Sequence, residues 1–138
     1  MARYGKIKTR LWTHSQKWAA LGGYDQARLL YLYLHTSPHR NSIGTYVLPE
    51  PYACSDLRWN QEVYRKSIQR LVEVGLVVYD AKESVVHITG AILQDPPTNK
   101  KHAEGMKASW EELPEGPCKE ACWNELSSAK HFHDDSLF

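Results

Sequence analysis

The stretch LVEVGLVVYD, residues 71–80, decides the fold that the sequence predicts. An apolar run with helical spacing ends at Gly75, and a β-type run, LVVY, begins at the next residue. Glycine is favoured just after the last turn of a helix because it adopts the left-handed backbone conformation without a Cβ penalty. We therefore predict that Gly75 joins a helix directly to the first strand of a hairpin.

The segment before this joint has the pattern of an amphipathic helix. Asn60 suits the N-cap position, and QEVYRKSIQRLVEV follows it. The spacing of three and four residues puts one set of side chains on the buried face: Tyr64, Ser67, Ile68, Leu71 and Val72. After the joint, strands over residues 76–79 and 85–88 form the hairpin, with residues 80–84 as its loop.

The region upstream supplies more helices and a short strand. Ser15 can cap the helix SQKWAAL, and Asp25 can cap DQARLLYLYLHT. The second of these is apolar on nearly every side, so we expect it to be the central buried helix. A short β run over residues 45–48 follows, and then Pro49 and Pro51 suit the first turn of a helix, PEPYACSDL.

This order of elements predicts the fold class. Helix, short strand, helix, turn, helix and hairpin is the layout of a winged helix-turn-helix. The expected class is mainly α with a small β-hairpin, a winged helix-turn-helix followed by C-terminal helices. The domain prediction is a winged helix-turn-helix over residues 1–91, a Pro-marked linker over 92–100, a helical extension over 101–130 and a tail over 131–138.

Two helices are expected after the linker. Asn99 can cap the first, whose apolar stripe is Ala103, Met106, Trp110 and Leu113. Pro117 starts the second, with these residues on one face: Cys118, Ala121, Cys122, Glu125, Leu126 and Ala129. Trp110 and Trp123 have two interpretations that the sequence leaves open, packing within one chain or contact with a second copy or another protein.

Composition and charge narrow the class of protein. The chain of 138 residues has 42% hydrophobic residues, enough for a core. A signal peptide, a membrane-length apolar run and a disulfide framework are all missing from the pattern, so we expect a soluble cytoplasmic protein. Residues 1–91 hold 12 Lys and Arg against 7 Asp and Glu, while residues 92–138 hold 5 against 9. A basic front half favours nucleic-acid binding, with ordinary solubilising charge as the alternative.

The outward face of the helix after Asn60 holds the candidate DNA-contacting residues. Gln61, Arg65 and Gln69 recur every four positions, and Gln and Arg side chains bond adenine and guanine edges. Lys66 and Arg70 lie beside them and suit phosphate contacts, and Asn60 suits either role. The competing interpretation is that these are solvated polar residues of a surface helix.

Cations outside this helix are weaker candidates. Lys82 at the hairpin tip is flanked by Asp80 and Glu83, so the hairpin is either a phosphate contact or purely structural. The N-terminal segment interleaves cations with apolar residues, and these cations are candidates for following a DNA backbone: Arg3, Lys6, Lys8 and Arg10.

Metal binding and catalysis have little support in the pattern. Cys118, Cys122, His131 and His133 are zinc-type ligands, but their spacing is not a standard zinc pattern, so core cysteines are the better interpretation. No GK[ST] phosphate loop and no local signature of a nucleophile are present. We expect no cofactor, no metal and no enzymatic activity.

Several passages resemble one family. TSPH (residues 36–39), SIGTYVLP (42–49), LVEVGLVVYD (71–80) and DPPTNKKHAEGMKASWEELPEGPCKEA (95–121) are similar to the N-terminal winged-helix domain of phage and prophage replication initiator proteins, relatives of DnaD-type primosome proteins. The resemblance covers roughly residues 3–126. It implies double-stranded DNA binding in replication initiation or its regulation, in the cytoplasm of a bacterial host cell, with a replicative helicase or its loader as a partner. The alternative function is protein–protein interaction, through self-assembly into a homo-oligomer or through helicase or loader binding, without DNA.

Overall fold

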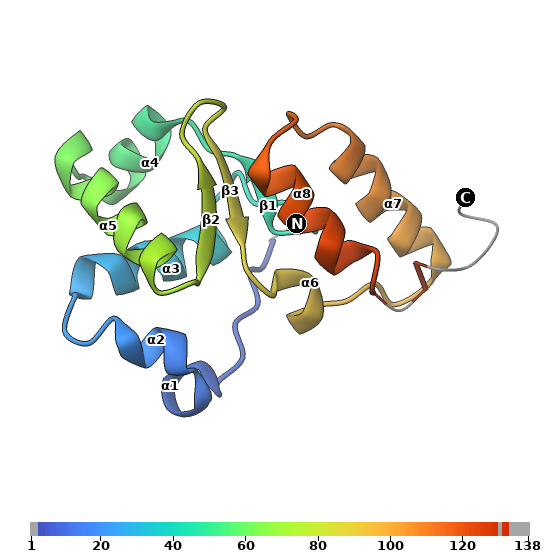
Figure 1. The fold of residues 1–138 in the computed structure, drawn as a ribbon, viewed down its shortest axis with the longest axis horizontal. Helices are drawn as coiled ribbons and strands as arrows, with labels where there is room; N and C mark the ends of the chain where they lie inside the picture. The colour runs from blue at the N-terminus through green and yellow to red at the C-terminus, as the bar shows by residue number, and fades with distance from the viewer. Residues whose placement is uncertain (1–2, 130, 133–138) are drawn as a thin grey trace.

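The fold places a small antiparallel sheet between two groups of helices (Figure 1). The computed structural model describes residues 3–129 and 131–132. The helices are α1 (Leu11–His14), α2 (Gln16–Ala20), α3 (Asp25–Thr36), α4 (Glu50–Leu57), α5 (Gln61–Glu73), α6 (Ala91–Gln94), α7 (Lys100–Glu111) and α8 (Pro117–Leu126). The strands are β1 (Thr45–Val47), β2 (Val77–Asp80) and β3 (Val85–Ile88). The chain is therefore mostly helical with one small sheet.

The sheet has the strand order β1-β3-β2, with both pairs antiparallel. Thr45 lies opposite His87 in one ladder, and Val78 lies opposite the same His87 in the other. The hairpin prediction is confirmed, although β2 begins and ends one residue later than expected. The short β run over residues 45–48 is the third strand, which the sequence alone did not pair with the hairpin.

The joint at Gly75 has the geometry expected of a glycine-terminated helix. Gly75 has φ +82°, its N–H bonds the carbonyl of Val72 at 3.1 Å, and the N–H of Leu76 bonds the carbonyl of Leu71 at 3.0 Å. This pair of bonds is the Schellman arrangement, which satisfies carbonyls at the end of α5. The joint therefore turns the chain from helix into strand within two residues.

Helix caps follow the sequence in most places. Ser15, Asn60 and Asn99 each accept a hydrogen bond from the backbone N–H three residues on. Asp25 differs from the prediction: it is the first residue of α3, and the N-cap position is held by Tyr24 without a side-chain cap bond. A carboxylate in the first turn still interacts favourably with the helix dipole.

Two burial predictions need correction. Helix α3 buries one face only, through Ala27, Leu30, Tyr31, Leu34 and His35, while Leu29 is 49% exposed. Val72 of α5, expected on the buried face, is 42% exposed. Both are apolar side chains that stay in contact with water although their helices pack against the core.

Helix α8 covers the sheet face opposite α3 and α5. Val86 and Ile88 of β3 pack into the core with α3 and α5, whereas Val85 and His87 contact α8, so every residue of β3 is buried. Trp110 and Trp123 pack against each other with ring centroids 4.5 Å apart, which is the within-chain alternative for these side chains. The described part of the predicted extension, residues 101–129, therefore packs on the same sheet as the preceding helices.

Residues of the predicted linker and tail contribute to a second core cluster, separate from the core around α3 and α5. Residues 91–94 form α6, and Ile92 is fully buried with Met106, Cys122 and Leu126. Phe132, placed in the tail by the sequence prediction, is buried and contacts Trp123 edge-on at 5.4 Å. Residues 133–138 of the predicted tail lie outside the described residues. Within the described part of the chain, no helix has the length and apolarity that a membrane span requires.

Candidate nucleic-acid interface

A tight turn sets α5 across α4. Arg58 ends α4 in the left-handed conformation at φ +58°, and the N–H of Trp59 bonds the carbonyl of Cys54 at 3.0 Å. Asn60 then starts α5, with its Oδ1 accepting from the N–H of Val63 at 3.0 Å. Asn60 is therefore occupied as a helix cap, and its side-chain NH₂ group remains for other contacts.

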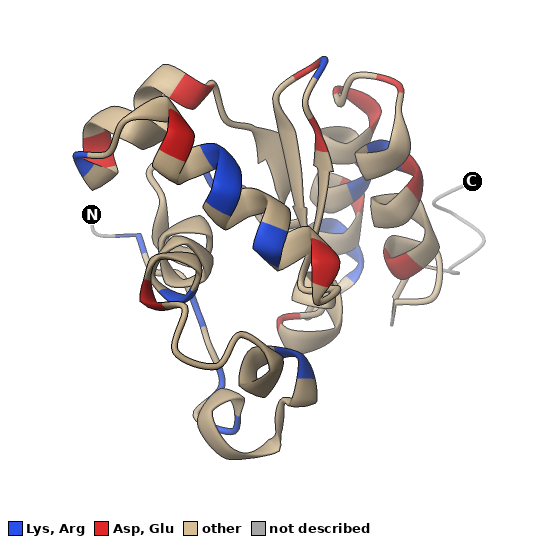
Figure 2. Ribbon diagram, turned by 60° about the vertical axis from the view of Figure 1, so that its left-hand side comes forward, with Lys and Arg blue, Asp and Glu red and all other residues tan. Residues whose placement is uncertain are grey.

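Helix α5 divides into a buried face and an outward face. Tyr64, Ser67, Ile68 and Leu71 are buried against the core. The outward face carries exposed polar side chains: Gln61, Glu62, Arg65, Lys66 and Gln69. Figure 2 shows α5 crossing the front of the molecule with its basic positions in the middle and an acidic position toward each end. The structure thus brings together Gln61, Arg65, Lys66 and Gln69, as the spacing predicted.

Each cation of α5 is paired with a carboxylate of the same chain. Arg65 makes a two-pronged contact with Glu50 of α4, at 2.8 Å from Nε to Oε1 and 3.1 Å from Nη2 to Oε2. Lys66 pairs with Glu62 at 2.9 Å. The hydrogen bond to Glu50 raises the pKa of Arg65, and the Lys66 partner lowers the pKa of Glu62. The outward face is consequently close to charge-balanced.

Arg70 has a different environment from the other cations. Its Nη2 donates to the carbonyl of Ala20 at 2.9 Å, and its Nη1 lies 3.3 Å from Oε2 of Glu73. The guanidinium therefore ties the end of α5 to α2 and satisfies a carbonyl near the end of that helix. The sequence prediction placed Arg70 with the phosphate-binding residues, whereas its main contacts in the structure are within the fold.

Lys82 lies at the exposed tip of the β2–β3 hairpin, beside two acids. Asp80 accepts a hydrogen bond from the N–H of Glu83 at 3.2 Å, which shapes the loop. Ser84 completes the turn with φ +55°. The hairpin tip is therefore a defined turn that holds one cation next to the carboxylates of Asp80 and Glu83.

The N-terminal cations do not extend the α5 face. The Arg3 guanidinium donates to the carbonyls of Pro38, at 3.2 Å, and of Arg40. Lys6 lies 3.6 Å from Asp95, near the end of α6. Lys8 and Arg10 line a pocket with Tyr31 of α3 and Gln94 of α6. The four candidates thus follow the segment that passes α3 and α6, and α5 supplies none of these contacts.

A buried polar chain was missed by the sequence analysis. Thr45 Oγ1 and His87 Nδ1 are 2.7 Å apart, and His87 Nε2 lies 2.6 Å from Glu125 Oε2. The same carboxylate accepts from the N–H of Gly90 at 3.0 and 3.1 Å. The signal in the sequence was a lone carboxylate, Glu125, on the apolar stripe of the last helix. A charged residue on such a stripe needs a buried partner.

This chain fastens α8 to the sheet. A hydroxyl, an imidazole and a carboxylate in line are also the groups of a catalytic triad. Here Thr45 is 0% exposed and His87 is 1% exposed, so no substrate reaches the hydroxyl in this conformation. The hydrogen bonds instead satisfy polar groups that α8 and β3 bury together.

The thiols of Cys118 and Cys122 are buried and protonated. Cys118 donates to the carbonyls of Val78 and Val85 at 3.4 and 3.3 Å, and burial raises its pKa to about 12. Burial likewise raises the pKa of Cys122 to about 11. Within residues 3–129 and 131–132, no three or more His, Cys, Asp or Glu side chains gather as a metal site. His133, one of the ligands weighed from the sequence, lies outside the described residues.

Comparison of the chain with protein-family models, with curated proteins and with solved structures finds no match. The resemblance to phage replication initiators therefore stays an expectation from the sequence. Any function for this chain has to be argued from the geometry of its own residues.

Proposed function

We propose that this chain is a winged helix-turn-helix domain that binds double-stranded DNA with α5 in the major groove. The observation that carries the proposal is the outward face of α5, where Gln61, Arg65, Lys66 and Gln69 are exposed together after a tight turn from α4. The β2–β3 hairpin follows α5 directly and serves as the wing. The sequence resemblance adds the context of phage replication initiation or its regulation.

Each residue on this face has a role that its chemistry suits. Arg65 can bond a guanine edge with two donors, and Gln61 and Gln69 can bond adenine edges. Lys66 is a point charge that suits a phosphate, as does Lys82 at the wing tip. Arg70 orients α5 on α2 and stays in that role when DNA binds.

The ion pairs on α5 exchange partners on docking. Solvent-exposed ion pairs contribute little to stability because water and salt screen them. A phosphate can therefore replace Glu62 as the partner of Lys66. Arg65 is also exposed and can turn to a guanine edge, although its partner Glu50 is only 18% exposed, so this exchange costs more. The displaced carboxylates remain near the duplex and repel it. We infer a moderate affinity for DNA. This affinity should depend only weakly on salt concentration, as expected for contacts with roughly two to three phosphates.

A second candidate function rests on the same charge balance. Protein–protein interfaces are depleted in net charge at their centre and include apolar residues. The α5 face pairs its cations internally, and Val72 at its edge is 42% exposed. In this alternative the face contacts a second copy of the chain or a replicative helicase or loader. Light scattering over a wide concentration range tests the first case, since a constant monomer mass excludes self-assembly.

The main experiment changes the cations and their partners separately. Binding of a fluorescein-labelled random duplex is followed by anisotropy for the wild type, Arg65→Ala/Lys66→Ala and Glu62→Gln. The double variant should weaken binding about tenfold or more, whereas Glu62→Gln should strengthen it by freeing Lys66 and removing a negative charge. Lys101→Ala, an exposed cation of α7, is the matched control and should leave the affinity unchanged.

Equal affinity in the wild type and both variants would contradict the assigned face. A melting temperature that stays constant across the variants shows that the fold is intact, because Arg65 and Lys66 are exposed. No DNA binding by the wild type even at low salt would favour the protein-interaction candidate.

A further inference from the structure

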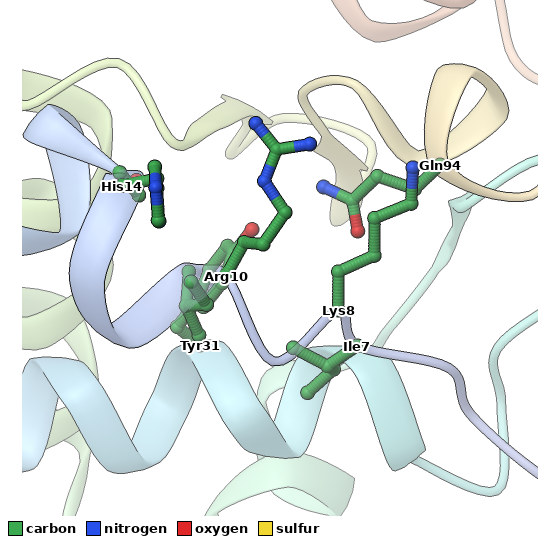
Figure 3. A pocket seen from close by; sticks show the side chains of 8 residues that line it. Ile7, Lys8, Arg10, His14, Tyr31 and Gln94 are labelled. Atoms are coloured by element: carbon green, nitrogen blue, oxygen red, sulfur yellow. The ribbon is translucent and has the colours of Figure 1, made fainter.

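A pocket separate from α5 lies between the N-terminal segment and helices α1, α3 and α6 (Figure 3). Its volume is about 180 Å³. The side chains that line it are Ile7, Lys8, Arg10, Leu11, His14, Ser15, Tyr31 and Gln94. No residue of α5 or of the β2–β3 hairpin contributes to this wall.

The charge of this pocket differs from that of α5. Lys8 and Arg10 bring two positive charges, and no carboxylate is among the lining residues. Within residues 3–129 and 131–132, none of the ion pairs involves Lys8 or Arg10, in contrast to Arg65 and Lys66. The two unpaired cations favour an anion from outside the chain.

Neutral hydrogen-bonding groups lie beside the cations. In Figure 3 the Arg10 guanidinium, the Gln94 amide and the Lys8 ammonium lie along one side of the pocket. Burial raises the pKa of Tyr31 to about 12, so its hydroxyl keeps its proton. The guanidinium fork and the ammonium group are the two side-chain types that most often hold phosphate oxygens.

Apolar groups complete the wall and limit the ligand. Ile7 and the Tyr31 ring lie opposite the charged groups, and Leu11 also lines the pocket. An apolar cavity of roughly 150 Å³ accommodates one benzene ring. A pocket of about 180 Å³ therefore has room for a phosphate group with about one ring, and a larger body extends into solvent.

We propose that this pocket binds a phosphate monoester, with Lys8, Arg10 and Gln94 on the phosphate oxygens and Ile7, Leu11 and Tyr31 against the attached ring. The site goes beyond the proposed function and does not depend on it, because its residues are distinct from the α5 face. The same chemistry would recognise a free small molecule or a phosphate of a nucleic-acid backbone, and the proposal is the free small molecule.

The test uses phenyl phosphate in a ¹H–¹⁵N NMR titration of the full chain. Saturable shifts are expected at the backbone amides of Lys8, Arg10, Leu11 and Gln94. The Lys8→Ala/Arg10→Ala variant should bind more than about tenfold more weakly, since each charge-assisted bond contributes about a factor of ten. Lys101→Ala should bind as the wild type does, and phenol, which lacks the phosphate, should give no saturable shifts.

Duplex DNA provides the second arm of the experiment. The proposal predicts that Lys8→Ala/Arg10→Ala keeps the DNA affinity of the wild type, so the failure of this site is distinguishable from the failure of the α5 interface. Shifts at the same amides with DNA but not with phenyl phosphate would overturn the small-molecule site and assign the pocket to a nucleic-acid backbone. Absence of saturable shifts with phenyl phosphate, or equal binding by the double variant, would also overturn it.

Discussion

Carboxylates take opposite roles in two regions of this molecule. On α5, Glu62 pairs with Lys66, and their side chains are 73% and 65% exposed. Beneath α8, Glu125 contacts His87 at 2.6 Å with the imidazole 1% exposed. Water competes for the Lys66–Glu62 pair and is largely excluded from the His87–Glu125 contact. The difference lies in burial rather than in distance, since both contacts are shorter than 3.0 Å.

The exposed pair on α5 can change its partner, whereas the buried contact beneath α8 cannot. An exposed pair can be exchanged for an outside partner at little cost because both ions keep most of their hydration. A buried pair that loses one member leaves the other without a hydrogen bond in a low-dielectric environment. The α5 face therefore suits an exchangeable interface, and the contact beneath α8 suits fixed packing.

The largest effect is expected from Glu125→Ala. The variant leaves His87 Nε2 and the N–H of Gly90 without their partner in the interface between α8 and the sheet. The free energy of unfolding should fall by about 3 kcal/mol, measured by urea denaturation. Glu120→Ala, an exposed position of the same helix, is the control and should change it by less than about 0.5 kcal/mol. Similar values for both variants would remove the distinction between buried and exposed carboxylates.

His35 extends the comparison to a buried group without a hydrogen-bond partner. Burial first, and then the charge of Arg40, lowers its pKa to about 4. Because the imidazole is neutral in the fold but takes up a proton near pH 6.5 when unfolded, its contribution is complete above that pH. The contribution is lost as the pH falls from about 6.5 to about 4 and amounts to roughly 3 kcal/mol. NMR titration of the His35 ring should give a midpoint well below 6, and a midpoint near 6.5 would contradict this account.

Gly75 tests the joint between α5 and the β2–β3 hairpin. Its φ of +82° is strained for a residue with a Cβ, although the nearest atom to such a Cβ would be Lys17 Cε at 3.5 Å. Gly75→Ala should therefore lower the free energy of unfolding by about 1 kcal/mol through backbone conformation alone. Gly105→Ala is a control for which we expect an effect of the opposite sign, because Gly105 lies within α7 with no atom within 4 Å of the added Cβ. That variant should gain roughly 0.5–1 kcal/mol, and thermal unfolding shows whether the signs differ.

The smallest effect on stability is expected from Glu50→Gln. The change removes the charge that pairs with Arg65 but keeps a hydrogen-bond acceptor at the same place. The melting temperature should stay almost constant, while DNA affinity should rise because a negative charge near the duplex is removed. A large loss of melting temperature would indicate that the Arg65–Glu50 pair holds α4 on α5 and is not exchangeable.

Local rules in the sequence predicted the elements well. The caps at Ser15, Asn60 and Asn99 and the glycine at position 75 each depend on neighbouring residues only, and the structure has them as expected. The outward face of α5 followed from its helical period. Errors arose where neighbours decide burial, as at Leu29 and Val72, which are apolar residues at the edge of a packed face.

The spacing of residues along the sequence could not predict the long-range contacts. Nothing near Arg65 in the sequence indicates Glu50, which lies 15 residues away, and nothing near His87 indicates Glu125, 38 residues away. The N-terminal cations looked equivalent in the sequence, but their tertiary contacts differ. Arg3 donates to Pro38 and Lys6 pairs with Asp95, whereas Lys8 and Arg10 line a pocket beside α6. Such pairings depend on how the helices pack around the sheet.

The central claim is that the outward face of α5 binds duplex DNA. The most direct measurement is the affinity for a labelled random duplex at several salt concentrations, for the wild type and Arg65→Ala/Lys66→Ala. The account predicts binding at low salt, a logarithmic salt slope of roughly two to three for the wild type, and a slope about one unit smaller for the variant, because Lys66 is the phosphate contact that it loses. No binding at low salt, or the same slope in both proteins, would contradict it.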